Sequence, residues 1–144
     1  MGSPQRGWVE ELVSILRESV EDLCSIRDER IFQNLLEAKL RRAGLNFEKR
    51  VVLRSRDRPD LEVDLYHPGG MAVEVKLDPR FYQGIGQVLS ARELYGLDAV
   101  LLQVWEEVDE RTLRALSRLA ERLSLSIVLV ERRRRAVRVV GRVG

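Results

Sequence analysis

The sequence predicts an α/β protein in which helices flank a mixed central β-sheet. Segments with a helical spacing of apolar residues alternate along the chain with short segments of strand-like pattern, and the strands outnumber the helices between them. The chain has 144 residues, of which 44% are hydrophobic. This length and apolar content suit one domain built around one core.

The expected element order is α-α-β-β-β-α-β-α-β-β. Helices are expected where apolar residues recur every three or four positions, and strands where they alternate or form short continuous runs. The predicted helices are 8–25, 31–43, 81–95 and 109–123, the last with Asp109 as its cap. The predicted strands are 45–53, 61–67, 71–77, 99–105, 126–130 and 136–140.

We expect one domain over residues 1–144, with an N-terminal helical part (1–30), a core (31–105) and a C-terminal helix and β-hairpin (106–144). No apolar run approaches the roughly 20 residues that span a bilayer, and the N-terminus lacks the apolar segment of a secretory signal. We therefore expect a cytoplasmic protein with no membrane partner. The predominance of Arg over Lys, together with many Glu, indicates a protein from a hot environment.

Cysteine and histidine usage restricts the possible chemistry. Cys24 is the only cysteine and His67 the only histidine. This excludes disulfide frameworks, zinc sites of the Cys/His kind and most nucleophile–histidine pairs. Any chemistry would then depend on carboxylates, on lysine and on a metal ion held by carboxylates.

Charge is distributed unevenly along the chain. Residues 8–30 are predominantly acidic, residues 31–58 are predominantly basic, and a second basic run covers residues 132–135. A separation of this kind is typical of a protein with an anionic partner on one side.

The segment from Arg58 to Lys76 contains the most informative pattern. Each of its two predicted strands has one apolar and one charged face, because apolar and charged residues alternate. If residues 68–70 form a three-residue hairpin loop, paired positions sum to 138. Asp64 then lies opposite Glu74, and Glu62 opposite Lys76. A slip by one residue would separate the acids and expose apolar side chains, so the apolar pattern favours this register.

Two carboxylates that face each other across a strand pair repel, unless a cation lies between them. Mg²⁺ prefers oxygen ligands and needs only one or two carboxylates in addition to water. Asp64 and Glu74 could supply these ligands, with the carbonyl oxygen of Val75 as a third. Lys76 would share their face, where its ammonium group could assist a metal-bound water or stabilise charge on a phosphate.

The spacing of these residues resembles a known signature. Asp64, nine intervening residues and then Glu74-Val75-Lys76 are similar to the motif of the PD-(D/E)XK nucleases, and residues 31–105 match the αβββαβ core of that restriction-endonuclease-like superfamily. The resemblance implies a deoxyribonuclease dependent on Mg²⁺ (Mn²⁺ is possible) that hydrolyses phosphodiester bonds in duplex or structured DNA. It further implies that Asp64 and Glu74 bind the metal and that Lys76 is the catalytic lysine.

Two accessory positions resemble the RecB-like and archaeal Holliday-junction-resolvase branches of that superfamily. Glu37 is similar to their helical glutamate, which joins the metal shell, and Gln87 to the glutamine that follows the motif. The RecB-like pattern expects Tyr four residues after this glutamine, where the chain has Ala91. Glu37 could instead pair with Arg41 on the helix surface.

Several alternatives remain open at the level of sequence. Asp60 follows a proline and could be the motif aspartate in place of Asp64. Gly84 and Gly86 could allow the backbone to approach a phosphate, or could simply permit tight helix packing. The apolar stripe of the first helix, which includes Trp8 and Leu12, could form a homodimer face or pack within the chain.

The partner implied by the resemblance is DNA. We expect a set of basic residues and one exposed aromatic to contact its backbone: Arg41, Arg42, Lys49, Arg50, Arg54, Arg56 and Tyr82. Such a nuclease could cut internally or from ends, in DNA repair or recombination. The alternative function is a nuclease-like fold without catalysis that serves as a DNA-binding or assembly module.

Overall fold

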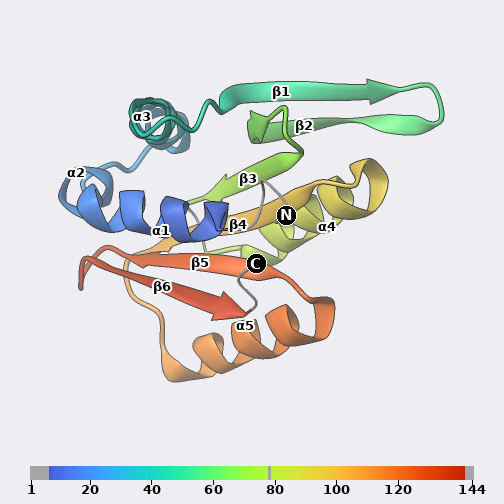
Figure 1. Cartoon of the computed structure of the whole chain (residues 1–144). Coiled ribbons are helices and arrows are strands. Elements are labelled where there is room, and N and C mark those ends of the chain that lie inside the picture. Colours follow the sequence, from blue (N-terminus) through green and yellow to red (C-terminus); the bar gives the residue numbers. More distant parts are fainter. Residues whose placement is uncertain (1–6, 78, 142–144) are drawn as a thin grey trace.

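The computed structural model describes residues 7–77 and 79–141 and confirms an α/β protein (Figure 1). Within these residues a six-stranded mixed sheet is flanked by five helices. The helices are α1 (Trp8–Glu18), α2 (Val20–Cys24), α3 (Glu29–Arg42), α4 (Phe81–Tyr95) and α5 (Glu110–Leu123). The strands are β1 (Glu48–Ser55), β2 (Arg58–His67), β3 (Met71–Lys76), β4 (Asp98–Trp105), β5 (Ser126–Glu131) and β6 (Ala136–Gly141).

The strands lie in the sheet in the same order as in the chain, from β1 to β6. Strands β3, β4 and β5 are parallel, and the other neighbours pair in antiparallel fashion. Helices α4 and α5 provide the two crossovers that parallel strands require. The carboxyl ends of the three parallel strands therefore meet at one edge of the sheet.

Each face of the sheet has its own apolar core. Helices α1, α2 and α3 cover one face, where Leu12, Phe32 and Leu36 pack with Val73 and Val75 of β3. Helices α4 and α5 cover the other face. That second core includes Val88 and Leu116 from the helices and Leu101, Ile127 and Leu129 from the strands. Strands covered on both faces explain the continuous apolar run in β4.

Most predicted elements are confirmed, with boundaries that shift by a few residues. The predicted helix 81–95 coincides with α4, and Asp109 caps α5 by accepting a hydrogen bond of 2.7 Å from the Thr112 backbone N–H. The single helix expected over 8–25 is wrong, because Ser19 interrupts it with φ −106° and ψ 10°. The apolar spacing stays helical up to Leu23, so local pattern gives no sign of this break.

The apolar stripe of α1 is buried within the chain. Trp8 is 2% exposed and Leu12 is fully buried, and the Trp8 indole N–H donates to the Asp98 carboxylate at 2.7 Å. The proposal that this stripe forms a dimer face is therefore wrong, since the sheet already covers it. A homodimer stays a prediction with no assigned surface.

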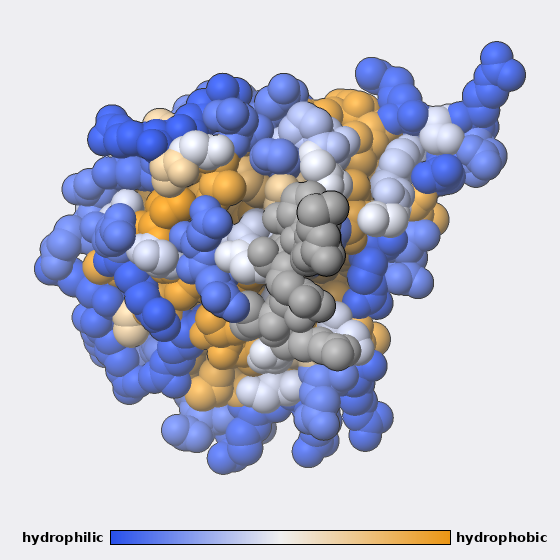
Figure 2. Space-filling model, in the orientation of Figure 1, coloured by the Kyte–Doolittle hydropathy of each residue, from blue (hydrophilic) through white to orange (hydrophobic). Residues whose placement is uncertain are grey.

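One face of the molecule is seen in Figure 2. Its rim is mostly hydrophilic, with hydrophobic patches between hydrophilic residues. The turn between β1 and β2 projects at the upper right of Figures 1 and 2 as a hydrophilic extension. Within residues 7–77 and 79–141, none of the helices has both the length and the apolar character that a membrane crossing requires.

The burial of α1 gives a stability prediction. Leu12→Ala should lower the free energy of unfolding by about 2–5 kcal/mol, because it leaves a cavity between α1 and the sheet. Glu11→Ala, at an exposed position of the same helix, is the control and should change stability little. Denaturant unfolding measures both variants. A Leu12→Ala protein that keeps wild-type stability but changes its mass in solution would instead support the dimer face.

Candidate metal site between strands β2 and β3

The hairpin between β2 and β3 has the predicted register. Leu65 pairs with Val73, Tyr66 with Ala72 and His67 with Met71, so the paired positions sum to 138. The loop closes with a hydrogen bond from the Gly70 N–H to the His67 carbonyl oxygen (2.9 Å), and Gly70 has φ +95°. Glycine adopts this left-handed conformation without strain.

The ladder between β2 and β3 ends at Leu65, which sequence reasoning missed. Because this ladder does not extend to Glu62, the predicted position of Glu62 opposite Lys76 is wrong; Glu62 pairs only on its other side, with Val52 of β1. Strand β2 turns over at this point: Leu65 packs in the core under α1 and α3, whereas Val63, two residues earlier, packs in the core under α4. In a straight strand, residues two apart face the same side.

Asp64 lies where the two strands part. Its carboxylate accepts a hydrogen bond of 2.8 Å from the Val75 backbone N–H. In a continued ladder Val75 would have faced Val63, so the side chain of Asp64 takes the place of a backbone partner. A buried N–H group needs such a partner, and this requirement fixes the Asp64 carboxylate beside β3.

Glu74 is the most unusual group of the site. Its side chain is 0% exposed, and neither carboxylate oxygen has a hydrogen-bond donor among the described residues. Burial, followed by the negative charge of the neighbouring Asp64 and the close approach of the two carboxyl groups, raises the pKa of Glu74 to about 9. The charge of Lys76 and the backbone N–H of Asp64 oppose this shift with smaller effects. A buried charge without a partner is costly, so this carboxylate is poised either to keep its proton or to accept a cation.

Lys76 is positioned by three neighbours. Its ammonium nitrogen lies 3.9 Å from a carboxylate oxygen of Glu29 at the start of α3, and its backbone carbonyl oxygen accepts from the buried Gln103 amide at 3.4 Å. A β-carbon added at Gly84 of α4 would lie 3.1 Å from Cγ of Lys76 and 2.5 Å from Cδ1 of Leu101. Only glycine therefore lets α4 close over the Lys76 side chain.

The residues present fit a hard divalent cation. Two adjacent carboxylates, one of them with both oxygens lacking a donor, form an all-oxygen donor set of the kind that Mg²⁺ takes together with water. Within the described part of the chain, no cluster of three or more acidic, histidine or cysteine side chains is arranged to hold a metal ion. Asp64 and Glu74 would thus be the protein's carboxylate ligands, and the role of the Val75 carbonyl oxygen stays a prediction.

Glu37 is not brought to this pair. Its carboxylate forms ion pairs with Lys49 (3.6 Å) and with Arg41 (3.8 Å). Glu29, the acid of α3 that does reach Lys76, lies eight residues earlier, or about 12 Å along a helix that rises 1.5 Å per residue. The Arg41 pair that the sequence offered as the alternative is thus present, and the role of Glu37 as a metal ligand stays a prediction.

Gln87 and Asp60, two further predicted site residues, have different environments: one side chain is buried at its oxygen and the other is exposed. Gln87 lies one turn after Gly84 on α4, and its side-chain oxygen is buried without a donor among the described residues. Asp60 is exposed and forms an ion pair with Arg54 at 3.4 Å. Asp64, and not Asp60, is thus the aspartate beside Glu74.

The predicted DNA-contacting residues lie mainly on α3, β1 and the turn after β1. Several of them already have partners: Arg50 donates to Gln33 and Asn34, and Lys49 pairs with Glu37. Arg42 and Arg56 are exposed, and Tyr82 on α4 is 61% exposed with its ring against Phe81. These cations thus lie along one edge of the sheet, but acidic neighbours already pair with some of them, as Glu37 does with Lys49.

Comparisons with known protein families, with curated proteins and with solved structures found no match. The class that the structure defines is an α/β protein with a six-stranded mixed sheet and five flanking helices in its described residues.

Sequence reasoning missed Glu29, Gly84 and Gln103 as neighbours of Lys76. Glu29 follows the cap residue Asp28, where an acid is favoured by the helix dipole in any case, so its position carried no distinct signal. The sequence predicted either tight packing or approach to a phosphate for the two glycines of α4. In the structure, Gly84 permits tight packing, whereas a β-carbon at Gly86 would meet nothing within 4 Å.

The raised pKa of Glu74 predicts a pH dependence of stability. Between the unfolded pKa of about 4.5 and the folded value of about 9, the folded state binds the extra proton, so stability should fall as pH rises through this window. One such group contributes at most about 1.4 kcal/mol per pH unit. Glu74→Gln should remove this component, and Mg²⁺ should reduce it in the wild type; urea unfolding at several pH values measures both effects.

Glu131→Gln is the matched control for Glu74→Gln. Glu131 is also 0% exposed, but its carboxylate has partners in Arg138 (3.0 Å) and in the Val108 N–H (3.3 Å). Its replacement should therefore lower stability without removing the Glu74 component. An unchanged pH profile in Glu74→Gln would contradict the assignment of the buried proton.

Proposed function

We propose that this chain is a divalent-metal-dependent deoxyribonuclease of the PD-(D/E)XK kind. The observation that carries the proposal is the Glu74 carboxylate, fully buried beside Asp64 and without a hydrogen-bond donor among the described residues. Structural ion pairs satisfy such groups with a cationic side chain, as Arg138 does for Glu131. At Glu74 the charge of Lys76 only partly opposes burial and the charge of Asp64, so this pair of acids suits an ion supplied from solution.

The residues of the site have separable roles in the proposed reaction. Asp64 and Glu74 would hold Mg²⁺ or Mn²⁺, which when bound polarises a phosphate and lowers the pKa of a water ligand. Lys76 lies on the same side of β3, and its ammonium group can stabilise the charge that develops on the phosphate. Gln103 and Gly84 act on Lys76 by fixing its backbone and its side-chain stem.

The exposed basic residues indicate an anionic substrate. Cations on α3, on β1 and in the β1–β2 turn lie along one edge of the sheet, and exposed members such as Arg42 and Arg56 suit phosphates of a nucleic acid backbone. Contacts of this kind position DNA without reading its sequence, so affinity should fall steeply with salt. Duplex or branched DNA cut internally fits this extended basic edge best.

A cleavage assay tests the proposed catalytic set. Wild-type protein with Mg²⁺ or Mn²⁺ should cut labelled DNA, and EDTA should abolish the reaction. Asp64→Asn, Glu74→Gln and Lys76→Ala should each lower the rate by about 100-fold or more, because the first two remove a metal ligand and the third removes the cation that stabilises charge on the phosphate. Asp60→Asn is the matched control and should cut at nearly the wild-type rate.

The outcomes of this assay separate the candidate functions. DNA binding with no cleavage under any metal condition would favour the non-catalytic DNA-binding or assembly module. Cleavage that survives both Asp64→Asn and Glu74→Gln would place the reaction elsewhere in the chain.

The packing of α4 against Lys76 gives a second activity prediction. Gly84→Ala should lower stability by about 1–3 kcal/mol, because its β-carbon collides with the fully buried Leu101. It should also reduce cleavage at a temperature where the variant remains folded, because Lys76 must move. Gly86→Ala introduces the same methyl group into open space two residues away and should leave cleavage intact. Equal activity of the two variants would contradict the role of Gly84 in positioning Lys76.

A further inference from the structure

A pocket of about 470 Å³ opens at the carboxyl ends of the parallel strands. Its rim includes Leu77, which directly follows Lys76, and Trp105 at the end of β4. Ligands of α/β proteins commonly bind at this edge of the sheet. The pocket contains neither Asp64 nor Glu74 and is therefore separate from the candidate metal site. Its lining residues that enter the argument are Arg27, Arg132, Phe81, Trp105, Asp109 and Thr112.

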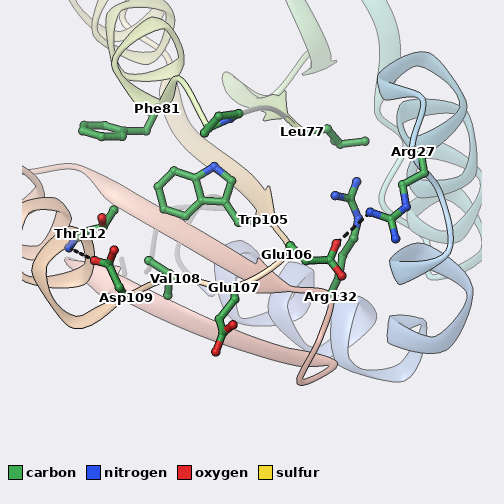
Figure 3. Close-up of a pocket in the computed structure, with 11 residues that line it drawn as sticks. Arg27, Leu77, Phe81, Trp105, Glu106, Glu107, Val108, Asp109, Thr112 and Arg132 are labelled. Atoms are coloured by element: carbon green, nitrogen blue, oxygen red, sulfur yellow. Dashed lines mark hydrogen bonds and ion pairs between the residues drawn. The ribbon is translucent and has the colours of Figure 1, made fainter.

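One end of the pocket is cationic. Figure 3 shows the guanidinium groups of Arg27 and Arg132 side by side, with Glu106 next to them. Glu106 binds Arg27 at 2.8 Å. Arg132 donates to the Ile26 carbonyl oxygen at 2.9 Å, and its Nε is buried without an acceptor among the described residues. Burial is the main cause that lowers the pKa of Arg132, and the charge of Arg27 lowers it further. An anion bound at this end would oppose both causes, because it stabilises the charged guanidinium group.

The carboxylates around the pocket are already engaged. Glu107 pairs with Arg133 at 2.9 Å, and Asp109 accepts from the Thr112 N–H at 2.7 Å. Glu106 lies at the arginine end and Asp109 at the other end (Figure 3), so acids at both ends disfavour a long polyanion across the whole pocket. The arginines can bind a single phosphate, and the remaining carboxylate oxygens can accept hydrogen bonds from amino groups.

The other end of the pocket is aromatic. The rings of Phe81 and Trp105 meet edge to face with centroids 6.1 Å apart. Phe81 is half-buried and lies at the end opposite to the arginines, with Trp105 between them (Figure 3). Trp105 is 7% exposed, so Phe81 is the more accessible of the two rings. An aromatic end next to a cationic end matches a nucleotide, which joins a planar base to a phosphate.

We propose that this pocket receives a single unpaired nucleotide of the DNA strand that is cut, with its phosphate on Arg27 and Arg132 and its base against Trp105 and Phe81. The inference rests on the proposed nuclease function. Leu77 lies three residues beyond Glu74, or about 10 Å along an extended strand, so the pocket is within reach of a nucleotide near the reacting phosphate. A base inside a duplex must leave its stack to enter a pocket. The favoured substrate therefore carries unpaired nucleotides next to the cut, as a flap or a branch point does.

Calorimetry tests the pocket without requiring catalysis. With EDTA present, deoxyadenosine monophosphate should bind the wild-type protein at least about tenfold more tightly than deoxyadenosine or inorganic phosphate, because only the nucleotide uses both ends of the pocket. Arg27→Gln, at an exposed position, and Arg132→Gln should each weaken binding by about tenfold. Arg134→Gln, a neighbouring arginine outside this pocket, is the matched control and should bind normally. Absence of nucleotide binding, or wild-type affinity in both the Arg27→Gln and the Arg132→Gln variant, overturns the inference.

Cleavage then tests the substrate class. With Mg²⁺, a duplex with a single-stranded flap should be cut about tenfold faster than a blunt duplex of the same sequence, and Arg27→Gln should remove this preference while the slower duplex cleavage continues. Equal rates on the two DNAs overturn the inference and leave the nuclease proposal standing. Failure to cut any DNA overturns the nuclease proposal, and with it the role of the pocket in cutting, whatever the calorimetry shows.

Discussion

The backbone N–H of Val75 donates a hydrogen bond to the carboxylate of Asp64 at the point where β2 leaves β3. This contact is required because a buried N–H group without an acceptor costs free energy, and the departing strand no longer supplies a carbonyl oxygen. It holds one acid beside a second, Glu74, whose own oxygens have no donor among the described residues. The candidate site thus arises from an interruption of the sheet.

The rest of the site is arranged around that interruption. On β3, Glu74 and Lys76 face α4, and Gly84 lets this helix approach closely enough to confine the Lys76 side chain. The neighbouring parallel strand supplies Gln103, which fixes the Lys76 backbone. The same strand ends at Trp105, where the sheet edge opens into the pocket between Phe81 and Arg132. The candidate cation site on β2 and β3 and the pocket at the ends of β3 and β4 are therefore neighbours along the chain but separate in lining.

The sequence allowed accurate prediction wherever one local pattern had a single physical interpretation. Apolar alternation in two short strands predicted the hairpin register, and the three pairs that form, from Leu65–Val73 to His67–Met71, have that register. Asp109 was identifiable as a cap, because its side chain satisfies a backbone donor of its own helix. The break at Ser19 and the end of the β2–β3 ladder were not predictable, because the apolar period continues unchanged through both.

The sequence by itself determined the α/β class, the order of the elements from α3 onward and the presence of Asp64, Glu74 and Lys76 on neighbouring strands, since these depend on periodicity and spacing along the chain. Only the tertiary structure decided that Glu37 binds Lys49 and that Glu29 lies beside Lys76. The same holds for the burial of Glu74 without a donor among the described residues. The physical reason is that periodicity identifies the buried face of a helix, whereas the position of that helix along the sheet follows from packing between segments distant in sequence.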